Sequence, residues 1–165
     1  MIHIETAHLL FQWVHYTALG FWTGGIFFFS VVSAPAVHRS LASHAVISQI
    51  VRSSLKRLNY LEIFCCLVLL TTTLAAQHVK APGAVSWKIL LGLFLLRGAT
   101  TGFYTFYLTL RMQVLESGQA GFDVLENGHP SKAAFQRLHR LYVSLMSFNF
   151  LLGMAGFYLS TAMWS

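Results

Sequence analysis

Long apolar runs alternate with short polar stretches along this chain, and the lengths of the runs predict membrane-spanning helices. No Lys, Arg, Asp or Glu stands between Thr6 and His38, and none follows Arg140. A helix needs about 20 apolar residues to cross the hydrocarbon core of a bilayer. We therefore expect an all-α, integral-membrane four-helix bundle formed by one domain of residues 1–165. The predicted spans are residues 7–37, 58–78, 85–110 and 141–164.

The polar stretches predict the connections between these spans. Pro35 lies near the end of the first run, where its missing N–H ends or kinks a helix. Residues 80–84 read as a short turn and residues 116–135 as a polar, Gly-rich connection. The second helix is expected to extend beyond its span, because apolar residues recur at helical spacing from Val46 onward. Ser131 is predicted as the N-cap of the helix that leads into the fourth span.

Composition supports a membrane protein and excludes several classes of function. The chain is 56% hydrophobic and 10% charged, whereas a soluble domain is about 25% charged. Only five acidic residues are present, with no carboxylate pair, Ser-His-Asp set or zinc-binding spacing, so we predict no hydrolytic catalytic residues. The net charge of +6 indicates contact with anionic lipid headgroups rather than with nucleic acid.

The distribution of Lys and Arg predicts the orientation, because cytoplasmic loops of membrane proteins carry most of these residues. The second connection has only Lys80 and Lys88 near it, and the tails have no Lys or Arg. Both termini are therefore expected on the outer (periplasmic) side of a bacterial inner membrane. The first and third connections hold Arg39, Arg52, Lys56, Arg57, Arg111, Lys132, Arg137 and Arg140.

A polar stripe runs along one face of the first predicted span. Its members follow helical spacing and are His8, Gln12, His15, Leu19 and Trp22. An ionisable side chain inside a span is costly unless it has a partner or a function. His8 lies near the interface, where it is solvated. His15 lies deeper, and two interpretations stay open: a cofactor or metal ligand, or a residue hydrogen-bonded to a neighbouring helix.

Glycine pairs four residues apart occur in two spans. They are Gly20 with Gly24, and Gly98 with Gly102. Such pairs let transmembrane helices approach closely, either within the bundle or against another subunit. We therefore predict these four glycines as helix-packing positions.

The third span carries two cations that face opposite sides of the helix. Lys88 lies near its outer end, where its side chain can reach the headgroups. Arg97 lies near mid-membrane, where a charge costs about 3 kcal/mol or more. Glu62, the acidic residue inside the second span, is the expected partner. A structural Glu62–Arg97 pair is favoured over an ion or proton path.

The first span and the end of the chain resemble an uncharacterised family of four-span membrane proteins. That group is a domain of unknown function related to an animal transmembrane protein. The matching residues at the start are His15, Trp22, Gly24, Gly25, Ala34 and Pro35. Near the end, Phe135, Leu138 and His139 match, whereas Tyr142 replaces the usual Ser and the Asn comes later, at Asn149.

The chain is more distantly similar to HemJ-type protoporphyrinogen oxidases and CopD-like copper-resistance membrane domains. His15, seven residues before Trp22, and Lys88 at the start of the third span fall on positions of the HemJ-type pattern. In that family the His takes part in binding haem b. The resemblance therefore implies a haem b site with His15 as the axial ligand, Lys88 at a propionate, and Trp22 and Gly24 beside the cofactor.

Three functional hypotheses follow, and whether the chain is an enzyme stays open. The first is a haem-b-binding or redox-active protein centred on His15. The second is a non-catalytic subunit of a homo-oligomer or of a larger membrane complex, in which the glycine pairs form the contact. The third is metal or drug transport, which Arg97 disfavours because a fixed cation repels other cations.

Overall fold

The computed structural model describes residues 2–40, 44–79, 86–117 and 129–164, and all of its regular structure is helical. The third span changes from α-helix to a π-helical segment and back, as does the first. The elements in chain order are α1 (Ile2–Phe28), η1 (Phe29–Ser33), α2 (Ala34–Ser40), α3 (His44–Val79), α4 (Ser86–Gly102), η2 (Phe103–Leu108), α5 (Thr109–Ser117) and α6 (Pro130–Trp164).

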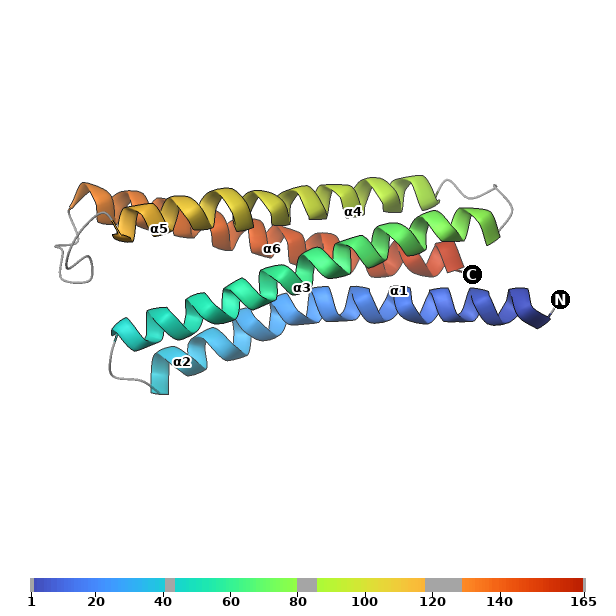
Figure 1. The fold of residues 1–165 in the computed structure, drawn as a ribbon, viewed down its shortest axis with the longest axis horizontal. Helices are drawn as coiled ribbons and strands as arrows, with labels where there is room; N and C mark the ends of the chain where they lie inside the picture. The colour runs from blue at the N-terminus through green and yellow to red at the C-terminus, as the bar shows by residue number, and fades with distance from the viewer. Residues whose placement is uncertain (1, 41–43, 80–85, 118–128, 165) are drawn as a thin grey trace.

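Four long antiparallel helical rods form the bundle (Figure 1). The rod of α1 and α2 packs against α3 and α6, and the rod of α4 and α5 also packs against α3 and α6. The start of α1 and the end of α6 lie at the same end of the bundle, which we call the termini end (Figure 1). The opposite end, where α2 and α5 lie, carries Arg39, Arg52 and Arg111 and is called the basic end.

The two halves of the bundle separate toward the basic end. There α2 stays beside α3, and α5 stays beside α6. Figure 1 shows these two helix pairs diverging, whereas the rods lie close together in the middle of the bundle. The core of the protein is therefore concentrated in the middle of the bundle.

The structure confirms the all-α four-helix class and contains four helices long and apolar enough to cross a membrane. These candidate spans are His8–Val37, Gln49–Ala76, Trp87–Ser117 and Pro130–Ala162. Many large apolar side chains face outward, among them Trp13 at 73% exposure and Phe64 at 63%. Since water would not solvate such a surface, the protein is a multi-pass membrane protein. The helices are longer than the predicted spans because helical periodicity continues into the polar segments.

Pro35 does not end the first rod. The π-helical segment η1 precedes it, with the N–H of Ala34 bonded to the carbonyl of Phe29, and α2 continues to Ser40. A wider helical turn before proline accommodates the missing N–H. The predicted turn at residues 80–84 lies outside the described residues.

The last helix begins earlier than the sequence predicted. Pro130 is its first residue, a position that tolerates proline because that N–H would be unpaired anyway. His129 caps the helix, since its Nδ1 accepts a hydrogen bond of 3.3 Å from the Ser131 N–H. Ser131 as N-cap was therefore wrong. The predicted connection 116–135 was too long at both ends, and its residues 118–128 lie outside the described part.

Candidate functional site

Buried polar residues gather at two depths inside the bundle. The first group, the histidine layer, consists of His15, Thr72 and Ser160, which are 0–3% exposed. The second group, the carboxylate cluster, lies closer to the basic end. Its members are Thr23, Glu62, Arg97, Thr101, Tyr104 and Asn149, which are also 0–3% exposed. Ten residues separate Thr72 from Glu62 along α3, which places the two groups about 15 Å apart.

The histidine layer joins three helices through one imidazole. His15 Nδ1 lies 2.8 Å from Thr72 Oγ1, and His15 Nε2 lies 2.9 Å from Ser160 Oγ. Thr72 also donates to the carbonyl of Val68 at 2.9 Å. A neutral imidazole with Nδ1 donating to Thr72 and Nε2 accepting from Ser160 satisfies all of these groups. The edge of Phe94 closes the site, with ring centroids 5.6 Å apart.

This arrangement does not fit haem ligation by His15. An axial ligand donates the lone pair of one imidazole nitrogen to iron, and here both nitrogens face hydroxyl groups. The other residues of the predicted cofactor site are not gathered around the imidazole. Lys88 is exposed with its Nζ 5.6 Å from the Trp87 ring, Gly24 is exposed, and Trp22 belongs with the carboxylate cluster. Haem binding stays a prediction that requires a hydroxyl contact to break.

The carboxylate cluster is centred on Glu62 of α3. Its Oε2 accepts hydrogen bonds from the hydroxyls of Tyr104 and Thr101, the latter at 3.1 Å. Asn149 of α6 donates from Nδ2 to Thr101 Oγ1 at 2.7 Å and to Tyr104 OH at 3.3 Å. Hydroxyl donors from the α4–η2 rod thus connect the carboxylate of α3 to the amide of α6.

The guanidinium of Arg97 belongs to the same cluster but makes no direct ion pair with Glu62 among the described residues. Its Cζ stacks 4.0 Å from the Trp22 ring centroid, and its Nη2 lies 3.5 Å from Thr23 Oγ1. Nε and Nη1 are buried and have no hydrogen-bond partner in the described part of the chain. Glu62 and Arg97 therefore belong to one cluster, as predicted, but not as a direct pair. Hydroxyl groups contact the Glu62 carboxylate, and the Trp22 indole faces the Arg97 guanidinium.

Two local features of the backbone make room for this cluster. A Cβ on Gly153 would lie 3.0 Å from Arg97 Nη2 and would clash with the Thr23 side chain, so only glycine fits there. Tyr104 lies in the π-helical segment η2, where the Thr109 N–H bonds to the Tyr104 carbonyl. Such π-helical turns are frequent at functional sites, and this one carries the hydroxyl that contacts Glu62.

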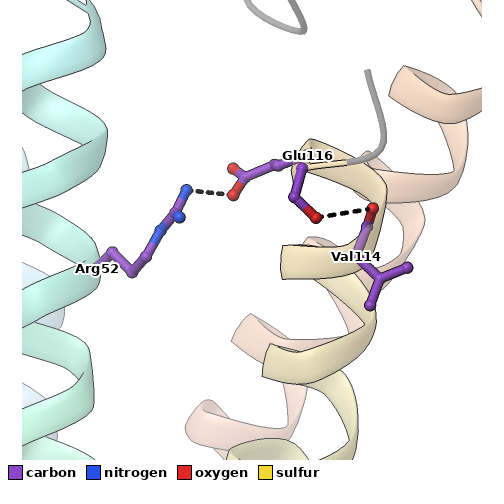
Figure 2. A network of polar contacts seen from close by, with 4 residues as sticks. Arg52, Val114 and Glu116 are labelled. Atoms are coloured by element: carbon purple, nitrogen blue, oxygen red, sulfur yellow. Dashed lines mark hydrogen bonds and ion pairs between the residues drawn. The ribbon is translucent and has the colours of Figure 1, made fainter. Parts of the chain in front are cut away.

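Two further contacts connect the helices between the carboxylate cluster and the basic end. Tyr142 donates its hydroxyl to Asn59 Oδ1 at 2.9 Å, and its ring lies edge-on to Tyr104 with centroids 5.0 Å apart. Closer to the basic end, Arg52 of α3 forms an ion pair with Glu116 of α5. Figure 2 shows Arg52 reaching across to Glu116 between the separated helix pairs.

The four predicted packing glycines have different surroundings. A Cβ on Gly98 would lie 2.6 Å from Cys66 Sγ, so Gly98 lets α3 and α4 approach closely. Gly20, Gly24 and Gly102 have nothing within 4 Å of such a Cβ, so these three glycines are not required by packing within one described chain. The groove beside Gly98 has a volume of about 340 Å³. Its lining residues are Ile63, Cys66, Leu67, Leu70, Leu95, Gly98, Ala99 and Thr101.

Several of the polar partners on neighbouring helices were not predicted from the sequence. Thr72 and Ser160 at the histidine layer and Thr23 and Asn59 near Glu62 were not singled out. One signal was available for Asn59, since it lies three residues before Glu62 and shares the inward face of α3. For a metal, no group of three His, Cys, Asp or Glu side chains occurs in the described ranges.

Fold and site together define a multi-pass membrane bundle with a buried cluster of charged and hydroxyl side chains. A family model described as a domain of unknown function, DUF4149, matches residues 17–119, and the chain belongs to this family. This match fits the predicted membership of an uncharacterised family, whereas the relationships to an animal transmembrane protein, HemJ-type oxidases and CopD-like domains stay predictions. No curated protein and no solved structure matches the chain. The matched segment includes Glu62 and Arg97, whereas His15 and Ser160 lie outside it.

Proposed function

We propose that this is a proton-handling membrane protein in which Glu62 binds and releases a proton and thereby changes how the helices pack. One observation carries the proposal. A fully buried carboxylate accepts two hydroxyl hydrogen bonds, while the cation of the same cluster is not ion-paired with it. A purely structural pair would place Arg97 directly on Glu62, because buried charges are stable when they are directly paired.

The surroundings of Glu62 support both of its protonation states. Burial in an apolar bundle disfavours the ionised form. The hydroxyls of Tyr104 and Thr101 and the nearby charge of Arg97 favour that form. Because these effects oppose each other, uptake of one proton costs less than it would in a cluster where a direct ion pair fixes the charge.

A proton suits this cluster better than a metal ion. Glu62 is the only carboxylate among its members, and a metal ion of the Mg²⁺ or Ca²⁺ type prefers several oxygen ligands. Arg97 already supplies a positive charge, which repels a second cation in a low-dielectric interior. A proton removes the charge of Glu62 and leaves the packing volume unchanged.

Protonation would act on the contacts between α3 and the α4–η2 rod. A neutral carboxyl group is a weaker acceptor than a carboxylate, so the hydroxyl contacts of Tyr104 and Thr101 weaken. Arg97 then loses the nearby negative charge that offsets its burial. The helices that hold these groups are therefore expected to shift when Glu62 becomes neutral.

Infrared spectroscopy of the detergent-purified protein across a pH series tests this proposal. We expect a carboxylic-acid C=O band that disappears as the pH rises and that is absent from Glu62→Gln. Only five acidic residues contribute to this spectral region, which makes the assignment direct. Glu62→Asp retains a carboxyl group and should retain a shifted band, and Glu116→Gln is the control. The Glu62 band is read from the difference between the spectra of the unchanged protein and Glu62→Gln, because the other four carboxyl groups are present in both. A pH series that is identical in the two proteins would overturn the proposal.

A second candidate function is a non-catalytic subunit of a membrane complex, and the glycine pair of α1, Gly20 and Gly24, favours it. Glycine costs a helix about 1 kcal/mol relative to alanine, and packing within the chain does not require Gly20 or Gly24. Native mass measurement in mild detergent tests this function. A species of more than one chain that is lost in Gly24→Leu but kept in Gly92→Leu supports it, because Gly92 also has open space but lies outside the pair. A single chain in every sample would exclude a homo-oligomer.

A further inference from the structure

Five atoms of the carboxylate cluster and its neighbour Trp22 are buried without a hydrogen-bond partner among the described residues. Two are acceptors, Glu62 Oε1 and Asn149 Oδ1, and three are donors, Trp22 Nε1, Arg97 Nε and Arg97 Nη1. Buried polar atoms in proteins are almost always partnered by protein or by ordered water. A buried water molecule typically makes about three hydrogen bonds, and this mixture of donors and acceptors is what such a molecule bridges.

We infer that the carboxylate cluster is a hydrated site and that its water exchanges with the basic end past the Tyr142–Asn59 hydrogen bond. The inference rests on the proposed function, because water is the source and the acceptor of the Glu62 proton. The water is located between Arg97, Glu62 and Asn149, and it enters and leaves from the basic end.

Access from the termini end is closed by apolar packing. Leu19, Leu69 and Phe94 are all 0% exposed and lie between the carboxylate cluster and the histidine layer. Even the small residue facing them is in contact, since a Cβ on Gly156 would meet Phe94 at 3.3 Å and Leu19 at 3.5 Å. A water molecule has no polar partner in this layer, so passage through it is slow.

On the side of the basic end, the closure combines buried apolar side chains, among them Ile26 and Leu108, with one polar contact. Tyr142 of α6 and Asn59 of α3 bond to each other at 2.9 Å, and both are at most 3% exposed. Beyond them the two helix pairs separate, and the contact that crosses between α3 and α5 in Figure 2 is the Arg52–Glu116 ion pair. Both of its side chains are partly exposed, at 48% and 22%, so this ion pair is not sealed inside the bundle.

The Tyr142–Asn59 bond therefore acts as a gate. When it breaks, the Tyr142 hydroxyl and the Asn59 amide can bind water next to the cluster, because Tyr104 lies directly against the Tyr142 ring. When it forms, the cluster is closed on both sides. Tyr142 is a positioning residue in this scheme, and its ring and its hydroxyl have separable roles.

Hydrogen–deuterium exchange of the protonated Glu62 carboxyl, followed by its infrared band in D₂O, measures water access. Tyr142→Phe keeps the ring and removes the gate bond. We expect exchange to be about tenfold faster, the change that loss of one net hydrogen bond gives. Ser160→Ala is the matched control, because it removes another cross-helix hydroxyl of α6 at the opposite end. Equal rates in the unchanged protein, Tyr142→Phe and Ser160→Ala would overturn the gate.

A second readout does not depend on the protonation of Glu62. Cys65, three residues after Glu62, is 2% exposed and has a free thiol. In a Cys66→Ala background, a small charged methanethiosulfonate should label Cys65 faster when Tyr142→Phe is added and no faster when Ser160→Ala is added. If the infrared band is missing, the proposed function fails, and this labelling still decides the gate. Equal labelling in all three proteins would overturn it.

Discussion

The histidine layer and the carboxylate cluster lie in the same bundle but differ in how completely their polar atoms are partnered. In the histidine layer, both nitrogens of His15 contact hydroxyls at 2.8 and 2.9 Å. In the carboxylate cluster, four atoms of Glu62, Arg97 and Asn149 have no partner in the described ranges. A layer whose polar atoms all have hydrogen-bond partners holds the helices together. A layer with unpartnered polar atoms can still bind a proton or a water molecule.

The comparison reverses the expectation drawn from the sequence. His15 was the candidate ligand and the Glu62–Arg97 pair was the structural element. The geometry instead supports a structural role for His15 and a functional role for Glu62. Variants at the two sites test this assignment. Similar effects at both sites would contradict it, and effects that differ in size and kind would support it.

Replacing Arg97 should give the largest loss of stability. Arg97→Met leaves the Glu62 carboxylate buried without a nearby cation, so we expect the free energy of unfolding to fall by about 3–5 kcal/mol. Glu62→Gln/Arg97→Met removes both charges and should recover most of this loss. Unfolding of the detergent-solubilised protein by denaturant measures it. A double variant as unstable as Arg97→Met would show that Arg97 acts through packing on Trp22 rather than through charge.

Replacing Gly153 should have the next largest effect. In Gly153→Ala the new methyl group meets Thr23 and Arg97 Nη2, so one of them must move. We expect a loss of about 1–3 kcal/mol, as for overpacked cores, together with a shift of the Glu62 infrared band. Gly24→Ala is the control, since its Cβ meets nothing within 4 Å. If both variants are equally stable, the cluster is more adaptable than its packing indicates.

The fold was predictable from the sequence because charge-free runs of sufficient length have few alternatives in a membrane. The inward direction of the first-span stripe was also predictable, since His15, Leu19 and Trp22 are all 0% exposed. The ends of the helices were predictable only in part. Helical spacing from Val46 onward predicted the extension of the second helix, and α3 begins at His44. The start of the last helix at Pro130 was not predicted, because Ser131 was expected as its N-cap.

The composition of the two sites could be predicted only in part. Glu62 and Arg97 were found because charges are rare inside spans. Their hydroxyl partners could not be assigned, because Thr and Ser are common in transmembrane helices. In addition, the sequence of one span does not show which helices lie next to it in the bundle. The role of Gly153 follows from its distance to Arg97 on another helix, which no spacing within α6 reveals.

Replacing His15 should have a moderate effect on stability and none on absorption. His15→Leu keeps much of the volume but leaves Ser160 without its cross-helix bond, so we expect a loss of about 1–2 kcal/mol. Because both ring nitrogens contact hydroxyls, the purified protein is expected to show no Soret band. A Soret band that disappears in His15→Leu would instead establish the haem ligand and overturn the structural role.

The Arg52–Glu116 ion pair should give the smallest effect, and it separates exposed from buried electrostatics within one molecule. Its side chains are 48% and 22% exposed, and exposed pairs contribute less than about 1 kcal/mol. We expect Arg52→Gln to lower stability by no more than this, with a coupling to Glu116→Gln that disappears at high salt because solvent ions screen the pair. The Arg97→Met loss should persist at high salt, since ions do not enter the bundle. Equal salt dependence in the two variants would mean that water and ions already reach the carboxylate cluster freely, and the contrast between an open basic end and a gated cluster would be lost.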